Sequence, residues 1–497
     1  MRNAHDVATI RAAEQALMAT VPPGALMQRA AAGLASVCAQ LVPAVYGARV
    51  VVLAGSGDNG GDALYAGARL ARRGAAVTAV AAGSRLHEAG TAALRGAGGR
   101  VTGPDDPGLA GLLDAADLIL DGMLGIGGKG GLRGAYADLA ALAGQARSRV
   151  VAVDLPSGID AGTGTVAGPA VRADVTVTFG TWKPGLLIDP AAGHAGVTEL
   201  IDIGLGPYLP CPAVAAAQAP DVAALLPEPP ADSDKYRRGV VGIVAGSDRF
   251  TGAAALAVGG ALRGGAGLIR LLSAPAAVAV VRQHWPEALI TVTGEDAAAG
   301  EEPAAAGRVQ AWVAGPGMGT DDRARQRLAA VLATELPVLV DADGLTLIAS
   351  DRGLLDRAAP TLLTPHAGEL GRLLGADPAE VAARRLEHAT RAAAELGATV
   401  LLKGSTTVIA SPAGPAGQDG TDGGDTAAPA AAGGWPAAPV FVNTTGTSWL
   451  ATGGTGDVLS GLAGALLAQG LSVPQAAAAG AFLHGIAARR AAAGARG

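Results

Sequence analysis

Short apolar runs alternate with alanine-rich helical stretches along the first part of the chain. The strand-like runs of this part are residues 49–55, 75–82, 118–121, 150–154, 175–179 and 198–203. Between the first two runs, residues 61–73 have a helical pattern. Because alternation of this kind is typical of βαβ units, we predict a parallel sheet with helices packed on it.

A second series of strand-like runs follows a proline-rich region. Its members are residues 240–245, 268–272, 311–314, 337–341, 362–364 and 399–409. Between the two series, residues 206–230 carry proline and alanine in segments such as LLPEPP, which break the periodicity and should not hold a strand ladder. We therefore predict three-layer αβα domains at residues 1–205 and 231–497, joined by a linker at residues 206–230.

Residues 411–439 have the composition of a flexible insertion in the second domain. The segment reads SPAGPAGQDGTDGGDTAAPAAAGGWPAAP and contains almost no large apolar group. Because such a segment cannot offset the entropy lost on ordering, we expect a flexible hairpin insertion that the domain can lose.

The composition is that of a folded protein with two or three domains. The 497 residues exceed one compact core, and 50% hydrophobic against 16% charged residues exclude a chain that is disordered throughout. Lys plus Arg number 37 and Asp plus Glu number 43, so the net charge is −6 and no basic face for nucleic acid is expected. Cys38 and Cys211 are the only cysteines, which excludes a disulfide framework and a cysteine zinc cluster and favours a reducing cytoplasm.

Two segments of the chain lack the features of an export signal or a membrane span. Residues 1–19 carry charges within a helical pattern and lack the uninterrupted apolar core of a signal peptide, so we expect no export signal. The apolar stretch from Pro474 onward is interrupted by His484, Arg489 and Arg490, so we expect no membrane span.

A glycine-rich loop follows the first strand-like run and opens a helical stretch. Residues 54–62 read AGSGDNGGD, and free backbone N–H groups at a helix start favour an anion such as a pyrophosphate. The letters GSGDNG fit the dinucleotide pattern G-x-G-x-x-G. A tight βα turn explains many such matches, and no acidic residue for a ribose follows the second strand.

Polar clusters also follow later strands of the first domain. Asp121 precedes the glycine-rich run GIGGKGG at residues 125–131, and Asp154 and Ser157 follow another strand. Because the carboxyl ends of parallel strands share one crevice, we expect these loops to converge with the loop at residues 54–62. Taken singly, each cluster could equally be a turn or a helix cap.

Together these motifs resemble the NAD(P)H-hydrate epimerase domain family over roughly residues 1–205. The family loop reads G-N-N-G-G-D-G and is followed by D-x-x-x-G and D-x-P-S-G; here Asp58 replaces the usual Asn and Ala63 the usual Gly. The resemblance implies a Rossmann-like fold and interconversion of the R and S epimers at the hydrated C6 of NADHX and NADPHX. Asp154 is the expected proton-transferring group, with an Asx cap as the alternative.

The same resemblance implies two sets of ligand-binding residues. Asn59, Asp121 and Ser157 would ligate a potassium ion, because one carboxylate with neutral oxygens suits a monovalent hard cation. The hydrated dinucleotide would be held by Asp58, Asn59, Gly60, Gly61, Asp62, Gly125, Ile126, Gly127, Gly128, Lys129, Gly130, Gly131 and Asp154.

The sharpest motif of the chain lies in the second domain, at residues 453–461 (GGTGDVLSG). Backbone N–H groups at a helix start form an anion hole, and Asp457 could take a proton from an attacking hydroxyl, as phosphoryl transfer requires. The alternative is an N-cap aspartate. Companion motifs at other strand ends are GPGMG at 315–319, TPHAGE at 364–369 and LKGSTT at 402–407. Alone, His366 would be a capping or packing histidine and Lys403 a solvated charge.

These motifs resemble the ribokinase-like superfamily and, more narrowly, the NAD(P)H-hydrate dehydratase family, across about residues 230–495. The resemblance implies ADP as co-substrate, with Mg²⁺, and Asp457 as the base: the C6 hydroxyl is phosphorylated and phosphate is then eliminated. No P-loop of the form G-x-x-x-x-G-K-[ST] is present, which argues against an ordinary NTPase. The hydrated dinucleotide would contact Ala253, Gly317, His366 and Asp457, and the adenine nucleotide would contact Lys403, Gly404, Ser405, Thr406, Thr407 and Gly456.

The order of the two resemblances indicates the bifunctional NAD(P)H-hydrate repair family. The partners it implies are hydrated NADH and NADPH and an adenine nucleotide, with no nucleic acid or membrane, in a cytoplasmic homo-oligomer. The alternative is a ribokinase-like kinase of a small molecule, such as a vitamin precursor, with a non-catalytic N-terminal binding module.

Overall fold

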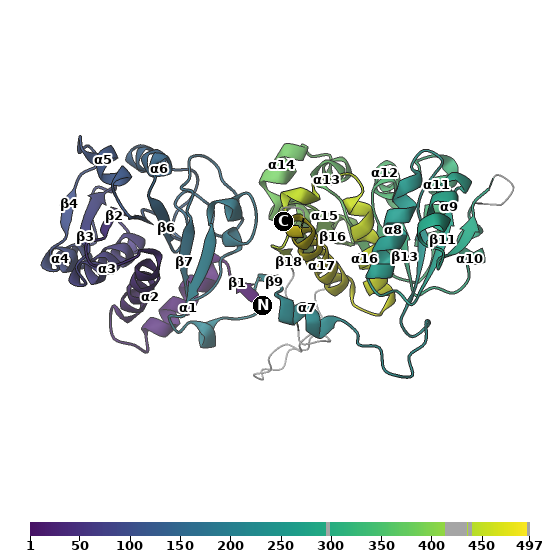
Figure 1. Cartoon of the computed structure of the whole chain (residues 1–497), viewed down its shortest axis with the longest axis horizontal. Helices are drawn as coiled ribbons and strands as arrows, with labels where there is room; N and C mark the ends of the chain where they lie inside the picture. The colour runs from purple at the N-terminus through teal and green to yellow at the C-terminus, as the bar shows by residue number, and fades with distance from the viewer. Residues whose placement is uncertain (295–298, 413–434, 436–439, 495–497) are drawn as a thin grey trace. The chain divides into compact units, whose positions relative to one another are not determined.

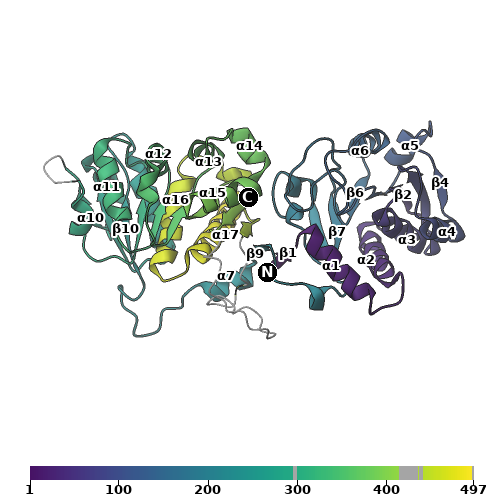
Figure 2. The same cartoon turned by 180° about the vertical axis from the view of Figure 1, so that it is seen from behind.

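The computed structural model describes residues 1–294, 299–412, 435 and 440–494. The chain forms two compact units: an N-terminal unit of residues 3–213, and a C-terminal unit of residues 214–497 together with Met1 and Arg2. In each unit helices cover a largely parallel sheet, which confirms the predicted α/β class (Figure 1 and Figure 2). No helix in the described part of the chain combines the length and hydropathy needed to cross a bilayer.

The N-terminal unit contains seven parallel strands in the order β4-β3-β2-β5-β6-β7-β8. They are β2 (Arg49–Ala54), β3 (Ala76–Ala81), β4 (Arg100–Thr102), β5 (Leu118–Gly122), β6 (Arg149–Val153), β7 (Val175–Phe179) and β8 (Val197–Ile201). The helices are α1 (Val7–Met18), α2 (Ala25–Leu41), α3 (Asp58–Arg72), α4 (Glu88–Gly96), α5 (Leu109–Asp114) and α6 (Ala135–Gln145). Val50 and Val52 pack with α2 and α3, whereas Val51 and Leu53 pack with α5 and α6, so the sheet is the middle of three layers.

The C-terminal unit has an eleven-stranded sheet in the order β1-β9-β18-β17-β16-β15-β14-β13-β10-β11-β12. Its strands are β1 (Arg2–Ala4), β9 (Val214–Ala216), β10 (Val240–Val244), β11 (Leu268–Ser273), β12 (Leu289–Val292), β13 (Ala311–Ala314), β14 (Val338–Val340), β15 (Thr361–Leu363), β16 (Thr399–Leu402), β17 (Thr407–Ala410) and β18 (Val440–Asn443). The run from β12 to β16 is parallel, and β17 is antiparallel to both of its neighbours.

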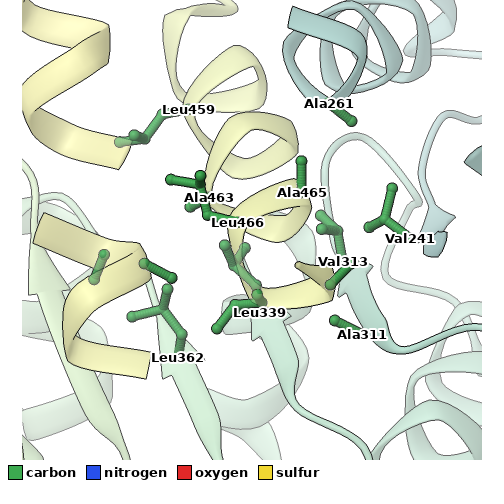
Figure 3. Packing of buried hydrophobic residues seen from close by; sticks show 14 of the residues in the cluster. Val241, Ala261, Ala311, Val313, Leu339, Leu362, Leu459, Ala463, Ala465 and Leu466 are labelled. Carbon is green, nitrogen blue, oxygen red and sulfur yellow. The ribbon is translucent and has the colours of Figure 1, made fainter. Parts of the chain in front are cut away.

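Eleven helices accompany this sheet among the described residues. They are α7 (Ala219–Leu225), α8 (Thr251–Arg263), α9 (Pro275–His284), α10 (Glu302–Ala305), α11 (Asp322–Leu332), α12 (Asp343–Ser350), α13 (Ala367–Leu374), α14 (Pro378–Ala383), α15 (Arg385–Leu396), α16 (Thr455–Ala468) and α17 (Val473–Gly494). Figure 3 shows Ala463 and Leu466 of α16 packed over Leu339 of the sheet. A Cβ atom at Gly461 would lie 1.9 Å from the carbonyl oxygen of Ala257, so α16 and α8 touch backbone to backbone and the first turn of α16 is held in place.

Apart from the run at residues 399–409, which was expected as one strand, the predicted strands agree with the structure to within a residue or two at each end. The runs at residues 175–179 and 311–314 coincide with β7 and β13. The run at residues 399–409 is a hairpin, in which β16 and β17 pair with Val400 opposite Ala410. The sequence did not predict β1, β4, β9, β12 or β18.

The expectation that residues 206–230 hold no strand is wrong. Within that segment, β9 pairs in parallel with β18, with Val214 opposite Val440, and α7 follows. The residues of β9 are apolar and buried. Pro220 lies in the first turn of α7, where a missing N–H costs nothing, so the prolines border the two elements without interrupting them.

One residue of the segment 411–439 belongs to the core. Residues 413–434 and 436–439 lie outside the described part of the chain, but Trp435 is 3% exposed and packs on Phe441 with ring centroids 5.0 Å apart. Its Nε1 donates to the carbonyl oxygen of Asp221 at 3.3 Å. The expectation of a segment without core contacts is therefore wrong at Trp435.

We expect Trp435→Ala to lower the free energy of unfolding by about 3–5 kcal/mol, because it removes a large buried ring. Trp449 is 61% exposed, so Trp449→Ala should change stability by less than about 0.5 kcal/mol. Thermal unfolding of the full chain measures both. Equal melting temperatures for the two variants would contradict a core role for Trp435.

Candidate active sites

The strand order of the N-terminal unit reverses next to β2. From β2 the chain adds β3 and β4 on one side and then returns to place β5 on the other. In open parallel sheets, ligands bind in the crevice at the carboxyl ends of the strands at such a point. The loops after β2 and β5 meet there, since a Cβ atom at Gly55 would lie 1.9 Å from the carbonyl oxygen of Met123.

A cavity of about 910 Å³ opens at this point of the N-terminal unit. Helix α1 and the first turn of α3 contribute to its walls, together with the loops that follow β5, β6 and β7. The predicted residues that line it are Asp58, Asn59, Asp62, Gly125, Ile126, Gly127, Gly128 and Asp154. Five of the residues predicted to hold the dinucleotide are not part of its lining among the described residues: Gly60, Gly61, Lys129, Gly130 and Gly131.

The first turn of α3 faces the cavity with free backbone donors. Gly57 is the N-cap, and the first bond within the helix runs from the Gly61 N–H to the Gly57 carbonyl. The N–H groups before Gly61 therefore have no acceptor inside the helix. Gly60 makes this turn possible, because a Cβ atom there would lie 2.2 Å from the carbonyl oxygen of Gly55.

Asp154 is held at the cavity by one of its two carboxylate oxygens. Its φ is 66°, a left-handed value that residues other than glycine rarely adopt. Its Oδ1 accepts hydrogen bonds from Lys183 Nζ, from Thr178 Oγ1 at 3.1 Å and from Phe179 N at 3.3 Å. Within the described residues Oδ2 receives no hydrogen bond, so it is the oxygen left for a ligand.

Lys183 is the buried cation of this site, and the sequence did not reveal it. The side chain is 1% exposed, and its ammonium donates to Asp154 Oδ1, Thr178 Oγ1 at 2.9 Å and the Phe179 carbonyl oxygen at 3.0 Å. All the ammonium hydrogens therefore have acceptors. Lys183 fixes the orientation of Asp154 through the contact with Oδ1.

Asp121 and Ser157 form a second buried group at the ends of β5 and β6. Ser157 donates to Asp121 through its Oγ, at 2.6 Å from Oδ1, and through its backbone N–H, at 2.8 Å from Oδ2. Burial raises the pKa of Asp121 to about 6. No positively charged side chain of the described residues pairs with this carboxylate.

Asn59 and Asp62 have buried polar atoms without partners among the described residues: Nδ2 of Asn59 and Oδ1 of Asp62. Burial, and after it the charge of Asp154, hold the pKa of Asp62 well above its usual range. Gly125 lies against Asn59, because a Cβ atom there would be 3.1 Å from Asn59 Oδ1. These unpaired atoms line or border the cavity, where a ligand could satisfy them.

In the C-terminal unit, the predicted motifs follow the parallel strands β13, β15 and β16, and α16 begins beside them. Gly454 is the N-cap of α16, and Asp457 lies in its first turn. The N-cap alternative for Asp457 is therefore wrong. The first bond of the helix runs from the Val458 N–H to the Gly454 carbonyl, which leaves the Gly456 and Asp457 N–H groups without helical acceptors.

Asp457 lies in a strongly charged environment. Burial and then the neighbouring Asp341 carboxylate raise the pKa of Asp457 to about 6, while the Lys403 ammonium opposes the shift. A Cβ atom at Gly456 would lie 3.3 Å from Lys403 Nζ, so Gly456 leaves room for that ammonium. Near neutral pH Asp457 is thus an ionised carboxylate with the proton affinity of a useful base.

Lys403 is fixed by two carboxylates that the sequence did not single out together. Its Nζ donates to Asp341 Oδ1 at 2.7 Å and lies 3.7 Å from Glu369 Oε2. Burial alone would raise the pKa of Asp341, but Lys403 and a 2.6 Å hydrogen bond from Ser460 hold it below its usual range. Burial opposes the charge of Lys403, yet Asp341 and Glu369 keep the Lys403 pKa above its usual value.

His366 caps a helix. It is the N-cap of α13, and its Nδ1 accepts from the Gly368 N–H at 3.0 Å while Glu369 accepts from the His366 N–H at 2.7 Å. The capping alternative stated for His366 is thus correct. Its side chain is 58% exposed, and its Nε2 lies 3.6 Å from Glu369 Oε1.

Ala253 and Gly317 come together, with a Cβ atom at Gly317 only 2.8 Å from that of Ala253. Leu256, further along α8, would lie 2.5 Å from a Cβ atom at Gly454. Helix α8 therefore contacts both Gly317, through Ala253, and the N-cap of α16, through Leu256. Both glycines have positive φ, at 59° for Gly317 and 89° for Gly454.

Of the predicted nucleotide residues 403–407, residues 403–406 form the turn between β16 and β17, and Thr407 begins β17. A Cβ atom at Gly404 would lie 2.2 Å from the guanidinium of Arg385, which donates to the Leu402 and Lys403 carbonyls. Thr406 is buried, Ser405 is exposed, and Thr407 pairs with Asn443 in β18. Of the residues predicted to bind the adenine nucleotide, Lys403 and Gly456 are the two that lie next to Asp457.

Comparisons with known proteins cover both units. Residues 23–185 match the family model described as YjeF-related protein N-terminus, and residues 241–434 and 430–496 match the model of NAD(P)H-hydrate dehydratase. The bifunctional NAD(P)H-hydrate repair enzyme Nnr of Mycobacterium leprae is 46% identical over 490 residues, covering 97% of this chain and 93% of that protein. The chain belongs to the bifunctional NAD(P)H-hydrate repair enzyme family.

Other members of this repair enzyme family give the same result. The protein of that name from Mycobacterium tuberculosis is 47% identical over 484 residues, which is 96% of this chain and 92% of that one. An ADP/ATP-dependent NAD(P)H-hydrate dehydratase of Bacillus subtilis, co-crystallised with ATP and Mg²⁺, is 30% identical over 53% of this chain and 85% of its own, with a TM-score of 0.42. The two family models and the mycobacterial relatives confirm the repair family inferred from the motifs, and the vitamin-precursor kinase is not favoured.

Proposed function

We propose that the N-terminal unit of this repair enzyme interconverts the R and S epimers of NADHX and NADPHX, and that the C-terminal unit dehydrates the S epimer with ADP. The family assignment supports the overall reaction. The observation that carries the division of labour is a separate carboxylate at the site of each unit: Asp154, which Lys183 holds, and Asp457, which lies in the first turn of α16. A cytoplasmic location and a homo-oligomeric state stay predictions.

In the dehydratase unit, Asp457 would take the proton of the C6 hydroxyl as its oxygen attacks the terminal phosphorus of ADP. The Gly456 and Asp457 N–H groups and Lys403 would stabilise the charge on the transferred phosphoryl group. Phosphate then leaves C6 and a proton leaves C5, which restores the dihydronicotinamide. Ala253, Gly317 and His366 are proposed to hold the hydrated dinucleotide, and residues 403–407 the adenine nucleotide.

Magnesium would reach this unit with the nucleotide. Its usual ligands at such sites are substrate phosphates together with one or two carboxylates. Among the described residues, Asp341, Asp343 and Glu369 lie close enough to Asp457 for their charges to act on it. The ion would neutralise negative charge on the phosphates.

In the epimerase unit, Asp154 would move the proton at the hydrated C6 through Oδ2, while Lys183 and Thr178 hold Oδ1. The free N–H groups at the start of α3 would bind the pyrophosphate. Residues Asp58, Asn59, Asp62 and 125–128 would contact the rest of the dinucleotide.

Asn59, Asp121 and Ser157 fit a potassium ion. Asp121 is a fully buried carboxylate without a cationic side-chain partner among the described residues, and oxygen atoms of Ser157 and Asn59 lie at the same strand ends. A monovalent cation would balance this charge and order the loops after β2, β5 and β6.

We expect Asp121→Asn to lower the apparent affinity for K⁺ in epimerisation by about 10–100-fold or more. Loss of a supporting group at a metal site has an effect of this size. Dehydration of pure S epimer should stay at the wild-type rate. Epimerisation at a series of K⁺ concentrations measures the first effect. If replacing K⁺ by tetramethylammonium leaves the wild-type rate unchanged, the ion has no role.

A single assay tests the two activities together. The full chain is given mixed R and S NADHX with ADP, and the recovery of reduced nicotinamide absorbance and of AMP is followed. Complete consumption requires both activities, because dehydration alone would leave the R epimer. A parallel run with ATP compares the two nucleotides.

A further inference from the structure

Glu14 is a second carboxyl group on the wall of the epimerase cavity. It is partly buried and lines the cavity from α1, and its carboxyl group has no hydrogen bond or ion pair within the described residues. Arg11, Gln15 and Met18 line the same cavity. Their spacing places all of them on one face of α1, so that this helix presents Glu14 to the ligand.

Glu14 and Asp154 belong to different walls. Glu14 comes from α1, whereas Asp154 and Lys183 come from the carboxyl ends of β6 and β7. Burial, and after it the charge of Asp154, raise the pKa of Glu14 above its usual value. The other charged groups around Glu14 are Arg11, Asp58, Asp62 and Lys183.

We propose that Glu14 is a second catalytic residue of the epimerase and that inversion proceeds by loss of water from one face of C6 and return of water on the other. This inference rests on the proposed epimerase function. A single carboxylate would suffice for opening and closing of the C6–N1 bond, in which the hydroxyl oxygen stays on C6. Two carboxyl groups on different walls suit a reaction in which an oxygen leaves on one side and arrives on the other.

Inversion at C6 takes two steps, the loss of water and the addition of water. Protonated Glu14 gives its proton to the C6 hydroxyl, the C6–O bond breaks with its electron pair on oxygen, and water leaves. The N1 lone pair forms an N1=C6 double bond. A water molecule on the opposite face then adds to C6, the double-bond electrons return to N1, and its proton passes to the Asp154 carboxylate. In the reverse direction Asp154 is the acid and Glu14 the base.

The test follows epimerisation of pure S-NADHX by the full chain in H₂¹⁸O without ADP. The epimers are separated by chromatography, and the mass of each is measured by mass spectrometry. We expect the R epimer formed by wild type to carry ¹⁸O beyond an enzyme-free control. Glu14→Gln should epimerise about 10²–10⁴-fold more slowly, with its affinity for NADHX within a few fold of wild type. The matched control Glu199→Gln, an exposed residue of β8, should behave as wild type.

The oxygen isotope in the R epimer and the rate of Glu14→Gln test separate parts of this proposal. An R epimer that keeps its ¹⁶O overturns the route through water loss, and a Glu14→Gln variant within a few fold of wild type overturns the role of Glu14. ADP-dependent dehydration of S-NADHX by the same variant should be normal, which shows that the C-terminal unit is intact. A thermal unfolding profile like that of wild type shows the same for the N-terminal unit. A wild-type chain without any epimerisation would instead overturn the proposed function of the N-terminal unit and the inference with it.

Discussion

Replacing Asp457 by Asn should lower ADP-dependent dehydration of S-NADHX by about 10²–10⁴-fold, the share of a general base, while ADP still binds. The amide keeps the size of the side chain but cannot accept the hydroxyl proton. The anion hole at the start of α16 consists of backbone N–H groups, which the substitution leaves in place. Turnover and ADP affinity, measured on the same preparation, separate the two effects.

The pH profile gives an independent readout for Asp457. Because its pKa is raised to about 6 and only the carboxylate accepts a proton, the dehydration rate should fall as the pH drops below 6 and be constant above it. In Asp457→Asn this acidic limb should disappear. The matched control is Asp322→Asn, an exposed carboxylate in the first turn of α11, with wild-type rate and profile expected. Near-normal turnover of Asp457→Asn would leave Asp457 without a role as base.

The sequence predicted strands whose apolar residues are buried on both faces, because such burial leaves a short run rich in apolar residues. β7 (VTVTF) and β13 (AWVA) are of this kind, and every residue in them is buried. β1 (Arg2–Ala4) reads RNA and is largely polar, and β9 (Val214–Ala216) lies in a segment rich in proline and alanine, so neither stands out as an apolar run. Their place in the sheet depends on pairing with strands far along the chain. The same holds for Trp435, a single aromatic residue in a segment whose composition indicates no core.

Site residues were predictable where a motif and a strand end coincide in the sequence. Asp154 and Asp457 are of this type, as Asp154 ends a strand and precedes the turn residues LPSG, and Asp457 follows the glycine-rich run GGTG. Lys183 and Asp341 acquire their roles only through tertiary contacts, with Asp154 and Lys403 respectively, and neither belongs to a glycine-rich motif. Buried charge pairs of this kind cannot be read from spacing, because the partners lie 29 and 62 residues apart.

We expect Asp154→Asn to lower epimerisation by about 10²–10⁴-fold, because the amide cannot move the proton at C6. The same substitution leaves the Lys183 ammonium buried without a counter-charge, and Lys183→Met leaves the Asp154 carboxylate in the same condition. Each single variant should therefore lose about 3–5 kcal/mol of unfolding free energy, the usual effect of removing one partner of a buried ion pair. Asp232→Asn, which removes one partner of the exposed pair with Arg237, should leave stability nearly unchanged.

The double variant Asp154→Asn/Lys183→Met separates catalysis from stability. Neither buried charge remains, so its melting temperature should return toward the wild-type value, since replacing both partners of a buried pair is often neutral. Epimerisation should stay as low as in Asp154→Asn, because the proton acceptor is still absent. Dehydration by the C-terminal unit serves as the internal standard. A double variant that regained epimerisation would reduce Asp154 to a structural residue, and one that stayed as unstable as the single variants would show that the ion pair is not what makes them unstable.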